Sequence, residues 1–219
     1  MKTENEILDL AFHMFLEKGF SAVSTNELIR ETGLTKGGFY YAFKSREDLD
    51  HRVIEKYLKG FFRLQAEGMQ QVWEDSGRDI PTEELLWKGF FHPMEFSNYQ
   101  KNVGADVLFR NFYFLLYESM KKFPDVLVAF QTHAEQKEEN LRRILERGQQ
   151  RGEIRRDIDL EDAITNIITM QGGILALMVL DDKINEGEKY QYIMRQMWKG
   201  ISTKKSDAYK DGGVISAVS

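Results

Sequence analysis

Apolar residues recur at helical spacing along most of the chain, and short polar or glycine-containing breaks separate these segments. In residues 4–18 the apolar positions fall at i, i+1, i+4, i+5 and i+8, which indicates an amphipathic helix. Gly19 follows this segment as a residue suited to the end of a helix. The pattern predicts helices rather than strands from the first residues onward.

Hydroxyl residues mark the starts of three further helices. Ser24 precedes Glu27 at capping-box spacing, Thr35 can cap a short helix over residues 36–43, and Ser45 precedes an acid at position 48. Gly33 lies in the turn between the second and third helices, where a positive φ is cheap for glycine. Short helix, turn and short helix form a helix-turn-helix, in which residues 36–43 take the place of the recognition helix.

After the cap at Ser45, a long helix is expected to run to about residue 71, and residues 74–81 form a polar break. The rest is again helical, and the predicted class is all-α with two parts. The first is a three-helix helix-turn-helix domain at residues 1–46, and the second is a larger helical domain at 47–202, for which the family resemblance described below implies effector binding and dimerisation. A flexible tail is expected at 203–219. The further helices are expected at about 82–92, 103–121, 125–150, 160–181 and 187–201.

The composition narrows the class of protein to which the chain can belong. The chain of 219 residues has no cysteine, which excludes disulfides, thiolate metal sites and cysteine nucleophiles and fits a reducing cytosol. The first ten residues are charged and lack the apolar core of a signal peptide, and no apolar run approaches the ~18 residues of a membrane span. We therefore expect a cytoplasmic protein without a membrane partner. The net charge of −5 leaves room for a local basic patch.

Such a patch lies at residues 35–46, where the sequence is TKGGFYYAFKSR and contains no acid. Lysines and helix N-terminal amides bind phosphates, and Gly37 with Gly38 would let the backbone approach the groove. Lys44 and Arg46 could also be ordinary solvated charges, and Phe39 and Phe43 fit a core better than a DNA contact. A helix-turn-helix that contacts only proteins stays open as an alternative.

Residues 6–58 resemble the DNA-binding domain of the tetracycline-repressor (TetR) family. The resemblance is carried by FLEKGF, then TNELIRETGLTKG, then FYYAFKSREDL, in the order typical of that family. It covers about a quarter of the chain. It implies a dimeric regulator, usually a repressor, that binds a double-stranded DNA operator and responds to a small molecule.

The resemblance also implies roles for single residues. Two positions depart from the family pattern, because Gly38 and Ala42 stand where larger or aromatic side chains are common. Phosphate contacts are implied for the residue that opens the second helix, for the first tyrosine of the pair and for the lysine after the recognition helix. The residues implied to contact DNA are Thr25, Thr35, Lys36, Gly37, Tyr40, Tyr41 and Lys44.

Aromatic residues are dense between positions 87 and 117. A mostly apolar pocket between helices is a usual small-molecule site. Each aromatic residue could equally belong to the core, so they predict an apolar effector site without identifying its contents. The residues proposed to bind the effector are Trp87, Phe91, Phe109, Phe112, Tyr113, Tyr117 and Gln171.

Dimerisation is expected through the helices at about 125–150 and 160–181. Gly172 and Gly173 each cost about 1 kcal/mol in the middle of a helix, which suggests a purpose such as close helix approach across a two-fold interface. A kink beside a ligand is the alternative. In this hypothesis a largely apolar or aromatic ligand shifts the long helix from residue 46 and releases the protein from a palindromic operator.

No catalytic set stands out. The four histidines are scattered, and the chain has no H-E-x-x-H, no P-loop and no G-x-S-x-G. We therefore expect no enzyme activity, no metal and no cofactor, although an all-helical enzyme stays open as an alternative.

Overall fold

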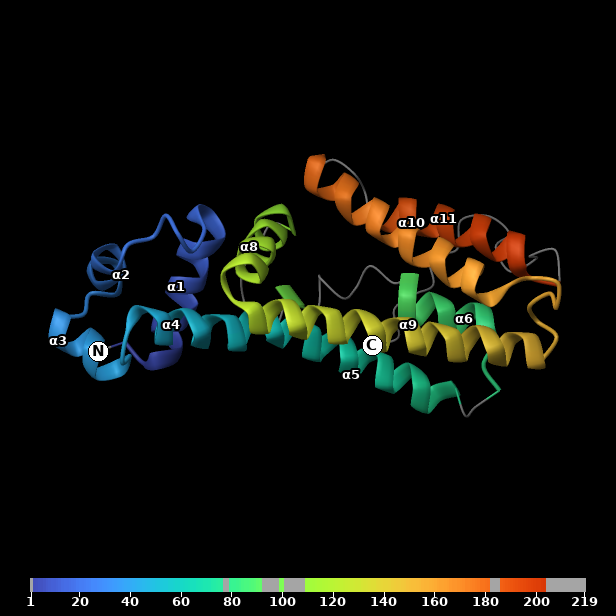
Figure 1. Ribbon diagram of the computed structural model, residues 1–219, viewed down its shortest axis with the longest axis horizontal. Coiled ribbons are helices and arrows are strands. Elements are labelled where there is room, and N and C mark those ends of the chain that lie inside the picture. The colour runs from blue at the N-terminus through green and yellow to red at the C-terminus, as the bar shows by residue number, and fades with distance from the viewer. Residues whose placement is uncertain (1, 77–78, 92–98, 101–108, 182–185, 204–219) are drawn as a thin grey trace. The chain divides into compact units, whose positions relative to one another are not determined.

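The computed structural model describes residues 2–76, 79–91, 99–100, 109–181 and 186–203, which form helices joined by turns (Figure 1). The expected all-α class is confirmed, and the described residues add one isolated antiparallel bridge between Ile154 and Ser202. The predicted tail beyond position 203 lies outside the described residues. The elements are α1 Glu4–Lys18, α2 Thr25–Thr32, α3 Lys36–Ala42, α4 Arg46–Val53, η1 Ile54–Leu58, α5 Lys59–Ser76, α6 Thr82–Leu86, η2 Trp87–Phe91, α8 Phe109–Lys122, α9 Pro124–Gln150, α10 Leu160–Leu180 and α11 Glu186–Ile201.

The chain divides into two compact units. The first comprises Met1–Gly68, Met94–Gln136 and Met178–Lys183, and the second comprises Met69–Pro93, Lys137–Leu177 and Ile184–Ser219. Helix α8 therefore belongs to the same unit as α1 to α4, although it is about sixty residues further along the chain. This placement matters for the DNA-binding helices, because α8 packs directly against α1.

Side-chain caps fix the starts of the N-terminal helices where the sequence predicts them. The hydroxyl groups of Ser24, Thr35 and Ser45 each accept a hydrogen bond from the backbone N–H three residues later. Gly33 ends α2 in the left-handed conformation with φ +72°. These caps stop α2 and start α3 within a few residues, which is what a helix-turn-helix requires.

Two predicted helices contain a wider turn. The segment expected as one helix from residue 46 to about 71 is α4, then the π-helical turn η1, then α5. The segment expected at 82–92 is α6 followed by the π-helical turn η2. Apolar periodicity predicts where a helix lies, but it does not reveal one inserted residue, because the buried face continues through the wider turn.

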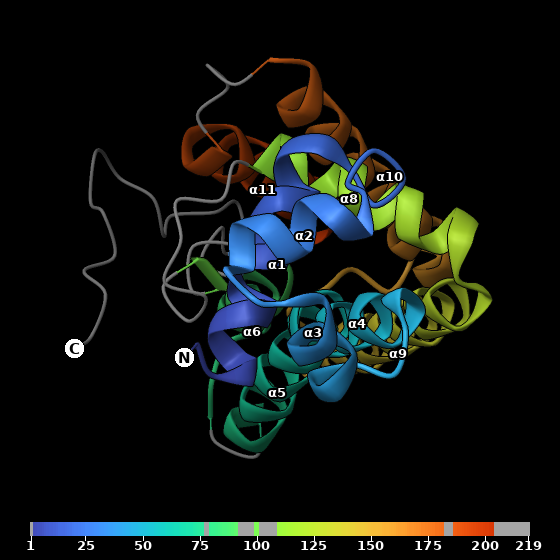
Figure 2. The same cartoon turned by 90° about the vertical axis from the view of Figure 1, so that its left-hand side faces the viewer.

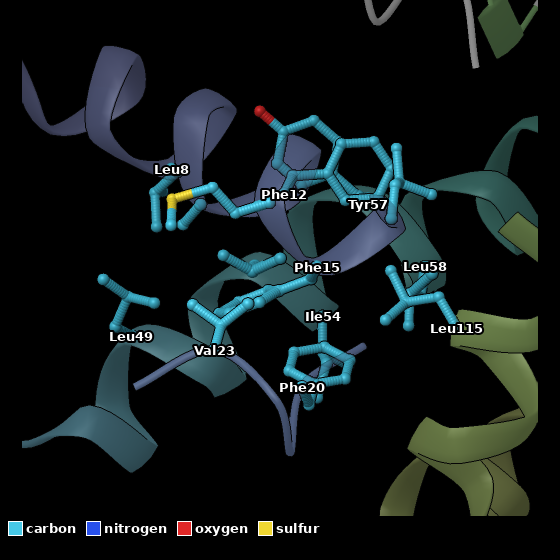
Figure 3. Close-up of a cluster of buried hydrophobic side chains, with 14 of the residues drawn as sticks. Leu8, Phe12, Phe15, Phe20, Val23, Leu49, Ile54, Tyr57, Leu58 and Leu115 are labelled. Atoms are coloured by element: carbon cyan, nitrogen blue, oxygen red, sulfur yellow. The ribbon is translucent and has the colours of Figure 1, made fainter. Parts of the chain in front are cut away.

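A core of aromatic and aliphatic side chains holds α1, α4 and α8 together in the first unit (Figure 3). The rings of Phe12 and Tyr57 stack with their centroids 4.0 Å apart. Leu49 of α4, Phe20 of the α1–α2 turn and Leu115 of α8 are all buried in the same cluster. Helices α1 to α3 therefore share one core with α4, η1 and α8.

The second unit has its own apolar core. Its buried residues come from α6, η2, α9, α10 and α11, and include Leu86, Ile144, Ile167 and Trp198. The carboxylate of Glu153 accepts the backbone N–H of Thr82 at 2.8 Å, which ties the loop after α9 to the start of α6.

Helix α10 is long and apolar enough to cross a membrane by length and composition, with a mean hydropathy of 1.8 over its most apolar window. About a third of that window is buried inside the chain. The buried third includes Ile164, Ile167 and Ile174, so α10 contributes to the core of the second unit.

Candidate DNA-binding site and effector domain

Helix α3 buries its phenylalanine side and exposes the side that carries its tyrosines. Phe39 and Phe43 are fully buried, as the sequence predicts, and their rings lie 5.6 Å apart. Tyr40 is 47% exposed and Tyr41 is 94% exposed. The Tyr41 side chain is therefore not held by the rest of the chain and is accessible to a partner. Figure 2 views the chain from the side of α2 and α3.

Gly37 and Gly38 of α3 have no side chain, so the helix backbone is less covered at these two positions. A Cβ built on Gly37 would meet no other atom within 4 Å, whereas a Cβ on Gly38 would lie 3.3 Å from the Thr35 hydroxyl oxygen. That hydroxyl accepts the backbone N–H of Gly38 at 3.0 Å and so caps the helix. Gly37 is therefore open to the surroundings, and Gly38 sits tightly against the cap.

Lys36 and Lys44 flank α3, and both are exposed. Thr25, at the first position of α2, is half-buried. All seven residues predicted to contact DNA therefore lie on α2, on α3 or directly beside them, within one helix-turn-helix. Their contacts with DNA stay predictions.

Arg46 differs from the two lysines. Its guanidinium donates to the Asp50 carboxylate at 2.6 Å, to the Phe20 carbonyl at 3.1 Å and to the Val23 carbonyl. It also lies over the ring of Phe15, 4.9 Å from the centroid. These contacts hold it inside the domain, so Arg46 is not one of the solvated charges that the sequence left open.

Glu118 of α8 reaches the turn between α1 and α2. Its carboxylate accepts the backbone N–H groups of Phe20 and Ser21, both at 2.9 Å, and the Ser21 hydroxyl at 2.7 Å. A Cβ on Gly19, whose φ is +83°, would lie 2.6 Å from a Glu118 oxygen. Partial burial opposes the charge, but the three donors outweigh it and hold the pKa of Glu118 below its ordinary value.

Lys122, one helical turn after Glu118, reaches α4. Its ammonium lies 3.2 Å from the carboxylate of Asp50, which is only 1% exposed. The same ammonium lies over the rings of Phe20 and Phe123. Sequence reasoning missed Glu118, Lys122 and Asp50; the local signals were the i, i+4 spacing of Glu118 with Lys122 and of Arg46 with Asp50.

Four predicted effector residues lie on α8. The rings of Phe109 and Tyr113 have centroids 5.5 Å apart, and those of Tyr113 and Tyr117 are 5.0 Å apart. Burial and the hydroxyl of Tyr117 raise the pKa of Tyr113 to about 12. Phe112 points elsewhere, into the core, with its ring 5.0 Å from that of Phe61.

The other three predicted effector residues lie in the second unit. Trp87 is buried in η2. Phe91 closes η2, and its side chain lies outside the described part of the chain. Gln171 is buried, and its amide donates to the Phe90 carbonyl in η2. A π-helical turn is a frequent feature of functional sites.

No group of three or more His, Cys, Asp or Glu side chains within the described ranges is arranged to hold a metal ion.

The geometry defines a helix-turn-helix protein with a helical effector domain. Residues 7–53 match the model of bacterial regulatory proteins of the tetR family, and residues 112–194 match the model of the tetracyclin repressor-like C-terminal domain. The chain therefore belongs to the TetR family of bacterial transcription regulators. TetR-family regulators are not enzymes, in agreement with the expectation from sequence.

Related sequences and solved structures agree with this family assignment. The uncharacterized HTH-type regulator YfiR of Bacillus subtilis is 35% identical over 74 residues, which span 33% of this chain and 36% of that one. The chain thus matches only about a third of the curated relative's length. The ketosteroid regulator KstR2 of Mycobacterium tuberculosis superposes with a TM-score of 0.63, 18% identity, and coverage of 92% and 95%. FadR of Bacillus subtilis, solved in complex with stearoyl-CoA, superposes with a TM-score of 0.56 and 19% sequence identity. The superposition covers 90% of this chain and 98% of FadR.

Proposed function

We propose that this chain binds double-stranded DNA in a sequence-specific manner and regulates transcription in the cytoplasm, as a repressor. The observation that carries the proposal is the outer face of α3. There Tyr41 is almost fully exposed, and Gly37 leaves the helix backbone accessible to a partner. Lys36 and Lys44 are exposed at the two ends of the helix. Exposed hydroxyls and lysines at the start and end of a recognition helix suit base and phosphate contacts respectively.

The test is binding of the purified protein to the DNA upstream of its own gene, measured by gel shift across a salt series. Tight and sequence-selective binding that weakens steeply with salt supports a phosphate-anchored regulator. If the upstream DNA is not bound, selection from random duplexes follows. A protein that retains no selective duplex after that selection contradicts the proposal and favours a helix-turn-helix that contacts proteins.

The DNA-bound form is proposed to be a homodimer through α9 and α10. Several apolar residues predicted for this interface, among them Leu141, Ile144, Ile164 and Ile167, are buried within the protomer instead. Large apolar side chains stay exposed on both helices, at Leu127, Val128 and Phe130 of α9 and at Ile168, Leu177 and Leu180 of α10. On α10 small exposed residues lie among them, including Gly172, Gly173 and Ala176.

Gly172 and Gly173 support close approach of a second helix rather than contact within the protomer. A Cβ built on either glycine would meet no atom within 4 Å beyond the helix itself. Among the described residues no neighbour requires their small size, whereas two copies of α10 could approach closely there. A two-fold axis would then place two α3 helices on successive half-sites of a palindrome.

The effector is proposed to be a small, largely apolar molecule. The aromatic residues of α8 support this proposal. The rings of Phe109, Tyr113 and Tyr117 contact one another in sequence, and Tyr117 is 57% exposed. Two proteins of the same fold are a ketosteroid transcriptional regulator and a regulator solved in complex with stearoyl-CoA. Release of labelled operator DNA by stearoyl-CoA or by a steroid, against a polar control such as choline, tests this class of ligand.

In the proposed mechanism the ligand shifts a population of conformations. It binds more tightly to a dimer whose recognition helices are spaced wrongly for the operator, and the ratio of its two affinities limits the change in DNA affinity. The movement would pass through the long segment α4–η1–α5, whose first helix shares a core with α1. Equal separation of the recognition helices with and without ligand would exclude this mechanism.

A further inference from the structure

We propose that Glu118 and Lys122 of α8 are positioning residues for DNA binding, because they hold the α1–α2 turn and α4 in the arrangement that the operator requires. We call Glu118, Lys122, Asp50 and Arg46 the α8 clamp. The inference rests on the proposed DNA binding but concerns residues that lie away from the face predicted to contact DNA.

The first contact of the clamp fixes the backbone of the α1–α2 turn. Glu118 accepts the N–H groups of Phe20 and Ser21, and Arg46 donates to the carbonyls of Phe20 and Val23. Both sides of the Phe20 peptide backbone are therefore held by charged side chains. Hydrogen bonds to ionised groups are stronger and more directional than apolar contacts, so they fix the course of the turn and not only its burial.

The second contact closes the circuit. Lys122 pairs with Asp50 at 3.2 Å, and Asp50 pairs with Arg46 at 2.6 Å. The path runs from α8 to the turn, from the turn to Arg46, and through Asp50 back to α8. Asp50 is buried, so loss of either cationic partner leaves its carboxylate poorly compensated.

The position of the turn explains why it matters for DNA. Ser24 caps α2 three residues after Ser21, and Thr25 is the first residue of α2. The start of α2 is predicted to bond a phosphate, and α3 follows directly after it. If the α1–α2 turn changed conformation, α2 and α3 would move with it. Only a fraction of the molecules would then hold the conformation that binds DNA.

The clamp and the predicted effector residues share one helix. Tyr113 and Tyr117 precede Glu118 on α8, which is a single helix of 14 residues. A ligand that displaces these tyrosines would move Glu118 and Lys122 as part of the same rigid element. This is a second route from ligand to DNA, separate from the long segment α4–η1–α5.

The experiment uses the full-length protein and a duplex selected by the wild type from random DNA. The variants are Glu118→Ala, the isosteric Glu118→Gln and Lys122→Met. The matched controls are Glu135→Gln, on the exposed side of α9, and Lys121→Met, exposed beside Lys122. Each protein is measured for duplex affinity over a salt series, for thermal unfolding, and for hydrogen exchange of residues 20–25.

We expect Glu118→Ala and Lys122→Met to bind the duplex about tenfold more weakly, with Glu118→Gln in between, because fewer molecules hold the competent conformation. The slope of affinity against salt stays unchanged because no phosphate contact is removed, and exchange of the Phe20 and Ser21 amides becomes faster. The controls behave as the wild type.

Two results overturn the inference. One is wild-type affinity in all three folded variants, and the other is an affinity that rises when the clamp is removed. If Glu118→Ala does not fold, Glu118→Gln and Lys122→Met decide in the same way. A wild type that selects no duplex at all contradicts the proposed function instead, and the clamp then has no DNA binding to position.

Discussion

At the scale of single residues, Lys44 and Arg46 show what a sequence can and cannot tell. Both are basic residues just after the recognition helix, and nothing in their neighbourhood separates them. In the structure Lys44 is exposed, whereas Arg46 is bound to Asp50 and to two backbone carbonyls. The Asp50 pair has the i, i+4 spacing of a helical ion pair, but the two carbonyl partners lie 23 and 26 residues upstream in a turn, and no local pattern predicts those contacts.

Lys44→Ala should weaken binding to the selected duplex for all sequences alike and reduce the salt slope by about 1. The ammonium is exposed, so its removal leaves the fold intact. Gel shifts at several salt concentrations measure both effects. An unchanged slope would mean that Lys44 contacts no phosphate, and unchanged thermal unfolding is the control for folding.

Acid should weaken the contact that Glu118 makes. Its pKa is lowered in the folded chain, so its contribution to stability is complete above the ordinary value near 4.5 and is lost as the pH falls through the lowered value. We expect the difference in unfolding temperature between wild type and Glu118→Gln to be largest near pH 7 and to shrink below pH 4.5. A difference that grows in acid would contradict this sign.

At the scale of elements, helix starts are the best predicted feature. The caps at Ser24, Thr35 and Ser45 are local, since each needs a hydroxyl and a backbone N–H three residues later. The π-helical turns η1 and η2 were not predicted, because the apolar face of the segment continues through them. Spacing therefore predicts existence and start of these helices but not their internal geometry.

Two glycine substitutions should distinguish a glycine that the backbone conformation requires from one that leaves room for DNA. Gly33→Ala should destabilise the chain by about 1–2 kcal/mol, because φ is +72° at that position. Gly37→Ala should stabilise it by about 0.5–1 kcal/mol, since alanine favours helices and the site is open. Urea unfolding measures both.

The same Gly37→Ala variant should bind the selected duplex more weakly than wild type, because its methyl group occupies the surface that is proposed to face the groove. Stability and DNA affinity would then move in opposite directions. Wild-type affinity in a stabilised variant would show that Gly37 lies away from the DNA.

At the scale of the whole molecule, the all-α class, the helix-turn-helix and the family were predictable from sequence. The aromatic residues between positions 87 and 117 were less informative. Phe112 is part of the core, whereas Tyr117 is exposed, although both fit the same pattern. Burial depends on which helices pack together, and α8 packs against α1, some hundred residues away.

If the proposed dimer forms through α10, Leu177→Glu should convert it to a folded monomer with weak binding to the selected duplex. Leu177 is 47% exposed on α10, so a carboxylate there is tolerated in the protomer, but two copies would meet across the two-fold axis. Sedimentation equilibrium measures the mass, and Gln150→Glu at the exposed end of α9 is the control. A Leu177→Glu protein that stays dimeric would place the interface elsewhere.

The wider turn η1 has a consequence for engineering. One residue corresponds to about 100° of rotation around a helix axis, so the extra residue in η1 sets the angular phase between α4 and α5. A chimera that joins these DNA-binding helices to another family member's effector domain must conserve the residue count through 54–58. Deletion of one residue there would turn every side chain downstream to a new direction while leaving both halves helical.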